Sequence, residues 1–146
     1  MKTEIAFWDT SAVVPLCVTQ ATTAAARQIH RDVSIKTIWW GTAVEIRSSF
    51  ARLRRTGELV DKDFEIAVNK WFAISQRGRK IPPSQRVLDL AATLPDRHGL
   101  RALDAFQLAA ALIWCSERPR NRPFICADER LGAAAKDAGF DVVSLI

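Results

Sequence analysis

Short apolar runs alternate with amphipathic stretches along the chain, and this alternation predicts the order of its strands and helices. Residues 4–8 form a nearly continuous apolar run, as expected for a strand that is buried on both faces. Residues 33–38 alternate β-branched and polar side chains, which predicts a second strand. A very short strand is expected at 80–83, and two more are expected at 124–127 and 141–145.

Helices are expected between these strands, because apolar residues recur there at helical spacing. The expected ranges are 11–17, 22–31, 42–55, 61–75, 85–94, 103–116 and 128–138. Asp61 and Ser84 are expected to cap the helices that follow them. Pro15 should disturb the first helix, and Pro95 should end the helix 85–94.

Strand and helix therefore alternate at both ends of the chain, with a helical block between. This order predicts an α/β fold with a central parallel sheet flanked by helices. The length of 146 residues fits a single domain. Ligands of such sheets bind beyond the carboxyl ends of the strands, where Asp9 and Asp128 are expected.

Composition places the chain among ordinary globular proteins, with 49% hydrophobic and 25% charged residues. The three cysteines lie in apolar stretches without CxxC spacing, which indicates buried thiols in a reducing compartment. We expect a cytoplasmic protein, because the N-terminus lacks the pattern of a signal peptide and the longest apolar run, 108–115, is too short to span a membrane. The net charge of +5 is compatible with a polyanionic partner, but alone it favours a mildly basic surface.

Asp9 follows the first apolar run directly, and an acid in that position must be hydrogen-bonded, capping or metal-bound. It could simply cap the next helix. Thr10 and Ser11 could cap that helix equally well, so a functional role for Asp9 is favoured. Ser11 is placed to orient the Asp9 carboxylate.

Three further acids stand at expected helix starts, and each has a structural explanation. Residues 42–45 read Thr-Ala-Val-Glu, a capping box that explains Glu45 without any function. Asp104 lies in the first turn of the most apolar helix, where the helix dipole favours an acid as much as a function would. Asp128 could be a plain N-cap. Each position alone is weak, but together with Asp9 they could converge on one pocket.

Carboxylate oxygens in such a pocket suit Mg²⁺ or Mn²⁺. Asp9, Asp104 and Asp128 are the first choices as metal ligands. Glu45 could bind the metal through water or act as a base, and the sequence does not separate these roles. Zinc is disfavoured, because the chain has no paired Cys or His spacing.

Four segments, 8–14, 42–45, 103–109 and 127–131, resemble the ordered motifs of PIN domains, and the resemblance extends over essentially the whole chain. It is closest to the VapC-type toxins of toxin–antitoxin pairs. The resemblance implies a three-layer α/β/α fold and a small Mg²⁺-dependent endoribonuclease that forms a homodimer and is inhibited by a cognate antitoxin. By position the family acids match Asp9, Glu45, Asp104 and Asp128, and Ser11 matches the family's small hydroxyl residue.

An RNA substrate and a protein partner would need surfaces of their own. Basic residues are expected to rim the pocket and hold phosphates, and the candidates are Arg52, Arg97 and Arg101, with Arg54 and Arg55 as further possibilities. An antitoxin segment is expected in an apolar groove near the first helices and the Glu45 helix. The residues that suggest this groove are Val13, Val14, Trp39 and Trp40. The tryptophan pair is bulkier than the PIN family usually shows.

Two other functions remain as alternatives. The chain could be a catalytically inactive PIN-like module that binds RNA or protein. It could also be a phosphohydrolase with Asp9 as nucleophile, but such enzymes carry a second aspartate where this chain has Ser11. A dinucleotide-binding module is disfavoured, because no Gly-x-Gly-x-x-Gly follows the first strand.

Overall fold

The fold is built on a five-stranded sheet in the order β3-β2-β1-β4-β5, seen in a computed structural model that describes residues 3–146. The strands are β1 (Thr3–Trp8), β2 (Val33–Trp39), β3 (Arg79–Ile81), β4 (Pro123–Cys126) and β5 (Asp141–Ser144). Each strand pairs with its neighbours in parallel, so the predicted parallel sheet is confirmed.

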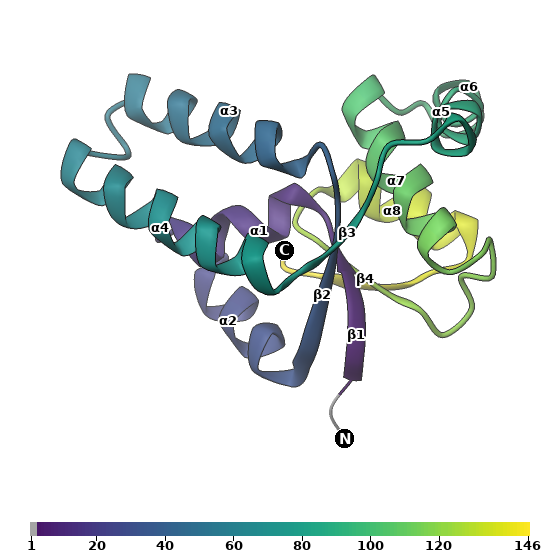
Figure 1. Ribbon diagram of the computed structural model, residues 1–146, viewed down its shortest axis with the longest axis horizontal. Coiled ribbons are helices and arrows are strands. Elements are labelled where there is room, and N and C mark those ends of the chain that lie inside the picture. Colours follow the sequence, from purple (N-terminus) through teal and green to yellow (C-terminus); the bar gives the residue numbers. More distant parts are fainter. Residues whose placement is uncertain (1–2) are drawn as a thin grey trace.

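Eight helices connect the strands in this part of the chain. They are α1 (Thr10–Cys17), α2 (Thr23–Asp32), α3 (Thr42–Arg55), α4 (Asp61–Arg77), α5 (Gln85–Ala91), α6 (Leu94–His98), α7 (Ala102–Trp114) and α8 (Glu129–Ala138). Helices α3 and α4 pack side by side and project to one side of the sheet, while α5 to α8 gather on the other side (Figure 1). The architecture is therefore a three-layer α/β/α sandwich.

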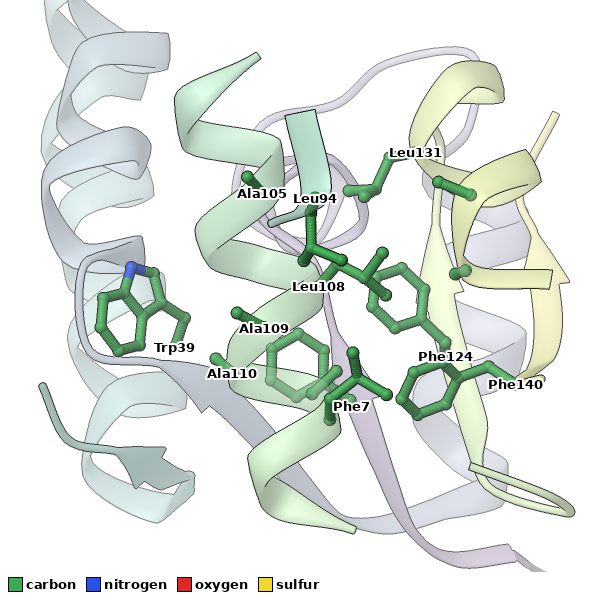
Figure 2. Packing of buried hydrophobic residues seen from close by; sticks show 14 of the residues in the cluster. Phe7, Trp39, Leu94, Ala105, Leu108, Ala109, Ala110, Phe124, Leu131 and Phe140 are labelled. Carbon is green, nitrogen blue, oxygen red and sulfur yellow. The ribbon is translucent and has the colours of Figure 1, made fainter. Parts of the chain in front are cut away.

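Alternate residues of the strands supply two separate cores, as expected for strands buried on both faces. Ala6 and Trp8 of β1 pack with α1 to α4, whereas Phe7 between them packs with α5 to α8. In the second core, the Phe124 ring of β4 packs against both Phe7 and Phe140, with ring centroids 5.5 Å apart in each pair (Figure 2).

The helix expected at 85–94 is instead two helices, so this prediction is wrong. Ser84 caps α5 as expected, because its Oγ accepts a hydrogen bond from the Val87 amide at 3.1 Å. The helix ends at Ala91, and α6 then begins at Leu94 with Pro95 in its first turn. Proline is well tolerated there, because the amides of a first helical turn have no partner within the helix. Pro95 therefore starts a helix rather than ending one.

The capping role expected of Asp61 is also wrong. Val60 occupies the N-cap of α4, and Asp61 is the first residue of the helix. Its carboxylate instead pairs with Arg54 of α3 at 2.7 Å, an exposed contact that joins the two projecting helices. Surface pairs of this kind contribute only about 0–1 kcal/mol, so the packing of α3 on α4 depends mainly on their apolar contacts.

The expected burial of the cysteines is confirmed, and Cys17, Cys115 and Cys126 are all free thiols. Within residues 3–146, no helix is both long enough and apolar enough to cross a membrane.

We predict that Phe124→Ala lowers the free energy of unfolding by about 3–5 kcal/mol, since it empties a fully buried site between two aromatic rings. Leu88→Ala is the matched control, because Leu88 is 50% exposed and should cost far less. Urea denaturation of both variants checks this. Equal losses for the two would contradict the core described here.

Candidate active site

An open pocket of about 510 Å³ lies at the carboxyl edge of the sheet, where the strands end and the next helices begin. Its lining includes all four acids singled out from the sequence: Asp9, Glu45, Asp104 and Asp128. They come from the start of α1, from α3, from α7 and from the junction of β4 with α8. The expected convergence is therefore present in the structure.

Asp9 is the most buried of these acids, with 3% of its surface exposed. It is the N-cap of α1, and its Oδ2 accepts hydrogen bonds from both the amide and the hydroxyl of Ser11. The Ser11 hydroxyl oxygen also accepts a bond from the Ala127 amide at 2.8 Å. Ser11 thus joins Asp9 to the end of β4, one residue before Asp128, and fixes the direction of the Asp9 carboxylate.

Burial raises the pKa of Asp9 from its ordinary value of 3.8 to about 6. The two hydrogen bonds from Ser11 favour the ionised form and oppose this rise, while the negative charges of Asp104 and Asp128 add to it. Asp9 therefore ionises at a free-energy cost that a cation in the pocket would remove.

Glu45 does not take part in a capping box, so that interpretation is wrong. Gly41 is the N-cap of α3, with no side-chain hydrogen bond, and Thr42 is already inside the helix. The Glu45 carboxylate instead accepts a hydrogen bond at 3.0 Å from Nε2 of Gln107. Burial raises the pKa of Glu45 to about 7, and the charges of Asp9 and Asp104 add to the rise, against the hydrogen bonds from Gln107 and Thr10.

Asp104 and Asp128 complete the acidic lining. Asp104 lies in the first turn of α7, and its pKa is raised by burial and by Asp128, while Arg101 and Arg130 act in the opposite direction. Asp128 is the N-cap of α8, and its Oδ1 accepts a hydrogen bond from the Leu131 amide at 2.7 Å. Both acids therefore combine a local helical role with a place in the pocket.

The donor chemistry of this pocket fits a hard divalent cation. Its ligating groups are carboxylates, and burial and mutual repulsion raise the pKa of three of them. In the described range 3–146, no three or more His, Cys, Asp or Glu side chains are already gathered as a metal site. Mg²⁺ is commonly held by only one or two carboxylates while it keeps several waters, so a pre-gathered cage is not required.

The expected basic rim is only partly present. Arg52 lines the pocket, and beside it Ser48 and Ser49 extend the lining along α3. Arg101 borders an adjoining hollow with Asp104 and Asp128, whereas Arg97 lies on α6 and does not line the pocket. Arg54 and Arg55 do not line it either, and Arg54 is engaged with Asp61.

The apolar groove expected from Val13, Val14 and the tryptophan pair does not exist as one surface. Val13 is wholly buried in the core, and Val14 lines the acidic pocket. Trp39 stacks on Phe106 of α7 at 5.6 Å, and with Trp40 it borders a separate groove beside α5. The tryptophans lie at the end of β2 and contact the helical layer of α5 and α7, on the opposite side of the sheet from α1.

Sequence reasoning missed several polar residues in or directly behind the pocket, and Gln107, which contacts Glu45 from behind the lining, is the most notable. It is fully buried in α7, where Leu108 to Ala111 around it are buried and apolar. A lone amide in the most apolar helix of the chain was the available signal. Gln20 and Thr22, from the connection between α1 and α2, also line the pocket and left no such signal.

Three solved structures share this fold over nearly their whole length. A toxin–antitoxin complex from Klebsiella pneumoniae is 18% identical, with a TM-score of 0.66, and the match covers 97% of this chain and 98% of that one. PAE2754 from Pyrobaculum aerophilum is 16% identical (TM-score 0.64; 99% and 92% covered). VapBC2 from Rickettsia felis, bound to a DNA fragment from its promoter, is 11% identical (TM-score 0.63; 96% and 98% covered).

These likenesses show that the chain has the PIN-like three-layer fold. No protein-family model matches the sequence, and no curated protein matches it either. At identities this low the comparison establishes the fold, and the function must be argued from the pocket.

We predict that the metal-free protein loses stability as the pH rises from about 4 to about 7. Asp9 and Glu45 release their protons near 3.8 and 4.5 when unfolded but near 6 and 7 when folded, so the folded state holds more protons in this window. The loss from Asp9 alone is roughly 3 kcal/mol.

Urea denaturation in the presence of a chelator, at pH 4.5 and at pH 7.5, measures this effect. Asp9→Asn removes the titrating group, so the fall in stability with pH should be smaller in that variant. A wild-type protein whose stability rises across this window would contradict the raised pKa values.

Proposed function

We propose that this protein is a metal-dependent endoribonuclease of the VapC type, the toxin of a toxin–antitoxin pair. The observation that carries the proposal is the convergence of Asp9, Glu45, Asp104 and Asp128 on one pocket at the carboxyl edge of a PIN-like sheet. Ligand sites of parallel α/β folds lie at that edge. Two of the solved structures with this fold are described as a toxin–antitoxin complex and as VapBC2.

In the mechanism that we propose, Asp9, Asp104 and Asp128 hold Mg²⁺ or Mn²⁺. When bound, the cation supplies a water of lowered pKa and neutralises charge on the phosphoryl oxygens. Ser11 keeps the Asp9 carboxylate directed into the pocket through its two hydrogen bonds. Glu45, with a pKa near 7, is suited to accept a proton from the attacking water at neutral pH.

The substrate that we propose is RNA. Arg52, Ser48 and Ser49 line the pocket on the side of α3 and offer one cationic and two hydroxyl groups to a phosphate next to the scissile bond. The net charge of +5 favours approach of a polyanion despite the acids in the pocket. A bound cation would complete this complementarity, because the carboxylates alone repel phosphate.

We also propose a cognate antitoxin as partner and a homodimer as the assembly. Two large apolar side chains next to the acids in the sequence are exposed: Val44 and Leu103, with 74% and 60% of their surfaces accessible. Val44 precedes Glu45 and Leu103 precedes Asp104, so a protein covering these side chains would lie over the mouth of the pocket. Large apolar side chains exposed to water favour contact with a partner protein.

We predict that a small protein co-purifies with this chain from its native cell and inhibits cleavage. Removing the co-purified protein under denaturing conditions, followed by refolding, should restore RNA cleavage. Purification of the chain alone from that cell, with full activity, would contradict the proposed partner and leave the nuclease assignment untouched.

We predict that Asp9→Asn abolishes RNA cleavage and weakens the Mg²⁺-dependent rise in melting temperature. Bound metal at about 100 times its Kd would stabilise the wild type by roughly 2.7 kcal/mol, and the variant should lose most of that. The metal-free variant should be at least as stable as wild type, because it removes a buried negative charge near Asp104 and Asp128. Cleavage of a mixed RNA pool and melting curves with and without Mg²⁺ measure both effects.

Asp63→Asn is the matched control, because Asp63 is exposed on α4 and does not line the pocket. Wild-type cleavage by Asp9→Asn in Mg²⁺ would rule out the proposed mechanism. A wild-type protein that binds RNA but never cuts it would favour the alternative of an inactive PIN-like binding module.

A further inference from the structure

Gln107 is an amide side chain that is fully buried in an apolar helix and reaches out of its own layer. It lies on α7, on the opposite side of the sheet from α1 and α3. Its Nε2 lies 2.9 Å from Oγ1 of Thr10 at the start of α1 and 3.1 Å from Oγ1 of Thr42 at the start of α3. It also lies 3.0 Å from Oε2 of Glu45. One nitrogen atom thus joins both helical layers at the carboxyl edge of the sheet.

The hydrogen-bond count of this amide favours its contact with Glu45. An amide nitrogen has two protons, and here three oxygens compete for them. A threonine hydroxyl can rotate and donate elsewhere, but an ionised carboxylate can only accept. Hydrogen bonds to a charged group are also the stronger ones, contributing about 1.5–3 kcal/mol. The bond from Nε2 to Glu45 is therefore the one that the amide retains when Glu45 is ionised.

The oxygen of the same amide group destabilises the folded protein. Oε1 of Gln107 is buried and has no hydrogen-bond partner among the described residues. A buried acceptor left unpaired costs about 1–3 kcal/mol. Methionine would fill nearly the same space without that cost, so packing alone does not explain an amide at this position. Its contact with a carboxylate of the acidic pocket does.

We infer that Gln107 is a positioning residue that holds the Glu45 carboxylate in its place in the acidic pocket. The inference rests on the proposed function, in which Glu45 accepts the proton of the attacking water. Thr10 and Thr42, each at the start of a helix that lines the pocket, offer hydroxyl oxygens as acceptors for the second proton of the amide. Gln107 acts through Glu45 and does not line the pocket itself.

The variant that tests this inference is Gln107→Met, which keeps the volume and removes the amide. The expected result is a kcat between about 10- and 100-fold lower, because a small displacement of a reacting group has effects of this size. KM should stay within about twofold, because Gln107 does not touch substrate. The melting temperature should change little, since the lost hydrogen bond to Glu45 is offset by removal of the unpaired Oε1. Gln85→Met, an exposed glutamine on α5, is the matched control and should keep wild-type kcat.

A crystal structure of Gln107→Met supplies a readout that does not depend on activity. The Glu45 carboxylate should leave its wild-type position or occupy several, while Asp9 and Asp128 stay in place. If Gln107→Met does not fold, Gln107→His replaces it. Imidazole has a similar volume and keeps an N–H donor, so Gln107→His should retain the position of Glu45 and most of the wild-type kcat. Gln107→Leu, which has no donor, should show the lowered kcat.

The outcomes separate the two claims. A wild-type chain that cuts no RNA in Mg²⁺ contradicts the proposed function, and the crystal structure of the variant still decides whether Gln107 positions Glu45. An unmoved Glu45 in Gln107→Met, or a folded variant with wild-type kcat, overturns the inference. A lower melting temperature with unchanged kcat would show that Gln107 only joins the two helical layers.

Discussion

The constraint on which the rest of this structure depends is the confinement of negative charge at one edge of a parallel sheet. Four carboxylates share one pocket, and burial and mutual repulsion raise the pKa of Asp9, Glu45 and Asp104. Such an arrangement opposes folding in the absence of a cation. It persists because the surrounding fold fixes each acid through its backbone and because neighbouring side chains hold the carboxylates in place.

Two polar side chains provide most of that local support. Ser11 joins Asp9 to the Ala127 amide at the end of the neighbouring strand β4. Gln107 reaches over the edge of the sheet from α7 to Glu45 on α3. Both contacts link segments far apart in the sequence, separated by 116 and 62 residues. The site is therefore a product of the sheet order, in which β1 and β4 are adjacent and the helical layers meet above their carboxyl ends.

The sequence predicted the features that depend on local pattern or strand direction. The apolar runs located the strands, and their alternation with helices predicted the parallel sheet and placed Asp9 and Asp128 at one edge. It did not predict features that depend on tertiary packing. The Thr42–Glu45 spacing matches a capping box, but packing turns both side chains toward Gln107 instead. Trp39 and Trp40 are adjacent to the Glu45 helix in sequence, yet they line a groove formed with α5 and α7. Pro95 is compatible with either a helix end or a helix start.

The most direct test of the central claim is the location of a bound divalent cation. Crystals soaked in Mn²⁺, with diffraction measured at a wavelength where manganese scatters anomalously, would show its position. The account predicts a peak in the pocket lined by Asp9, Asp104 and Asp128, and loss of that peak when excess Mg²⁺ competes. An empty pocket at saturating Mn²⁺, in crystals grown near neutral pH, would contradict a metal-dependent site built from these acids.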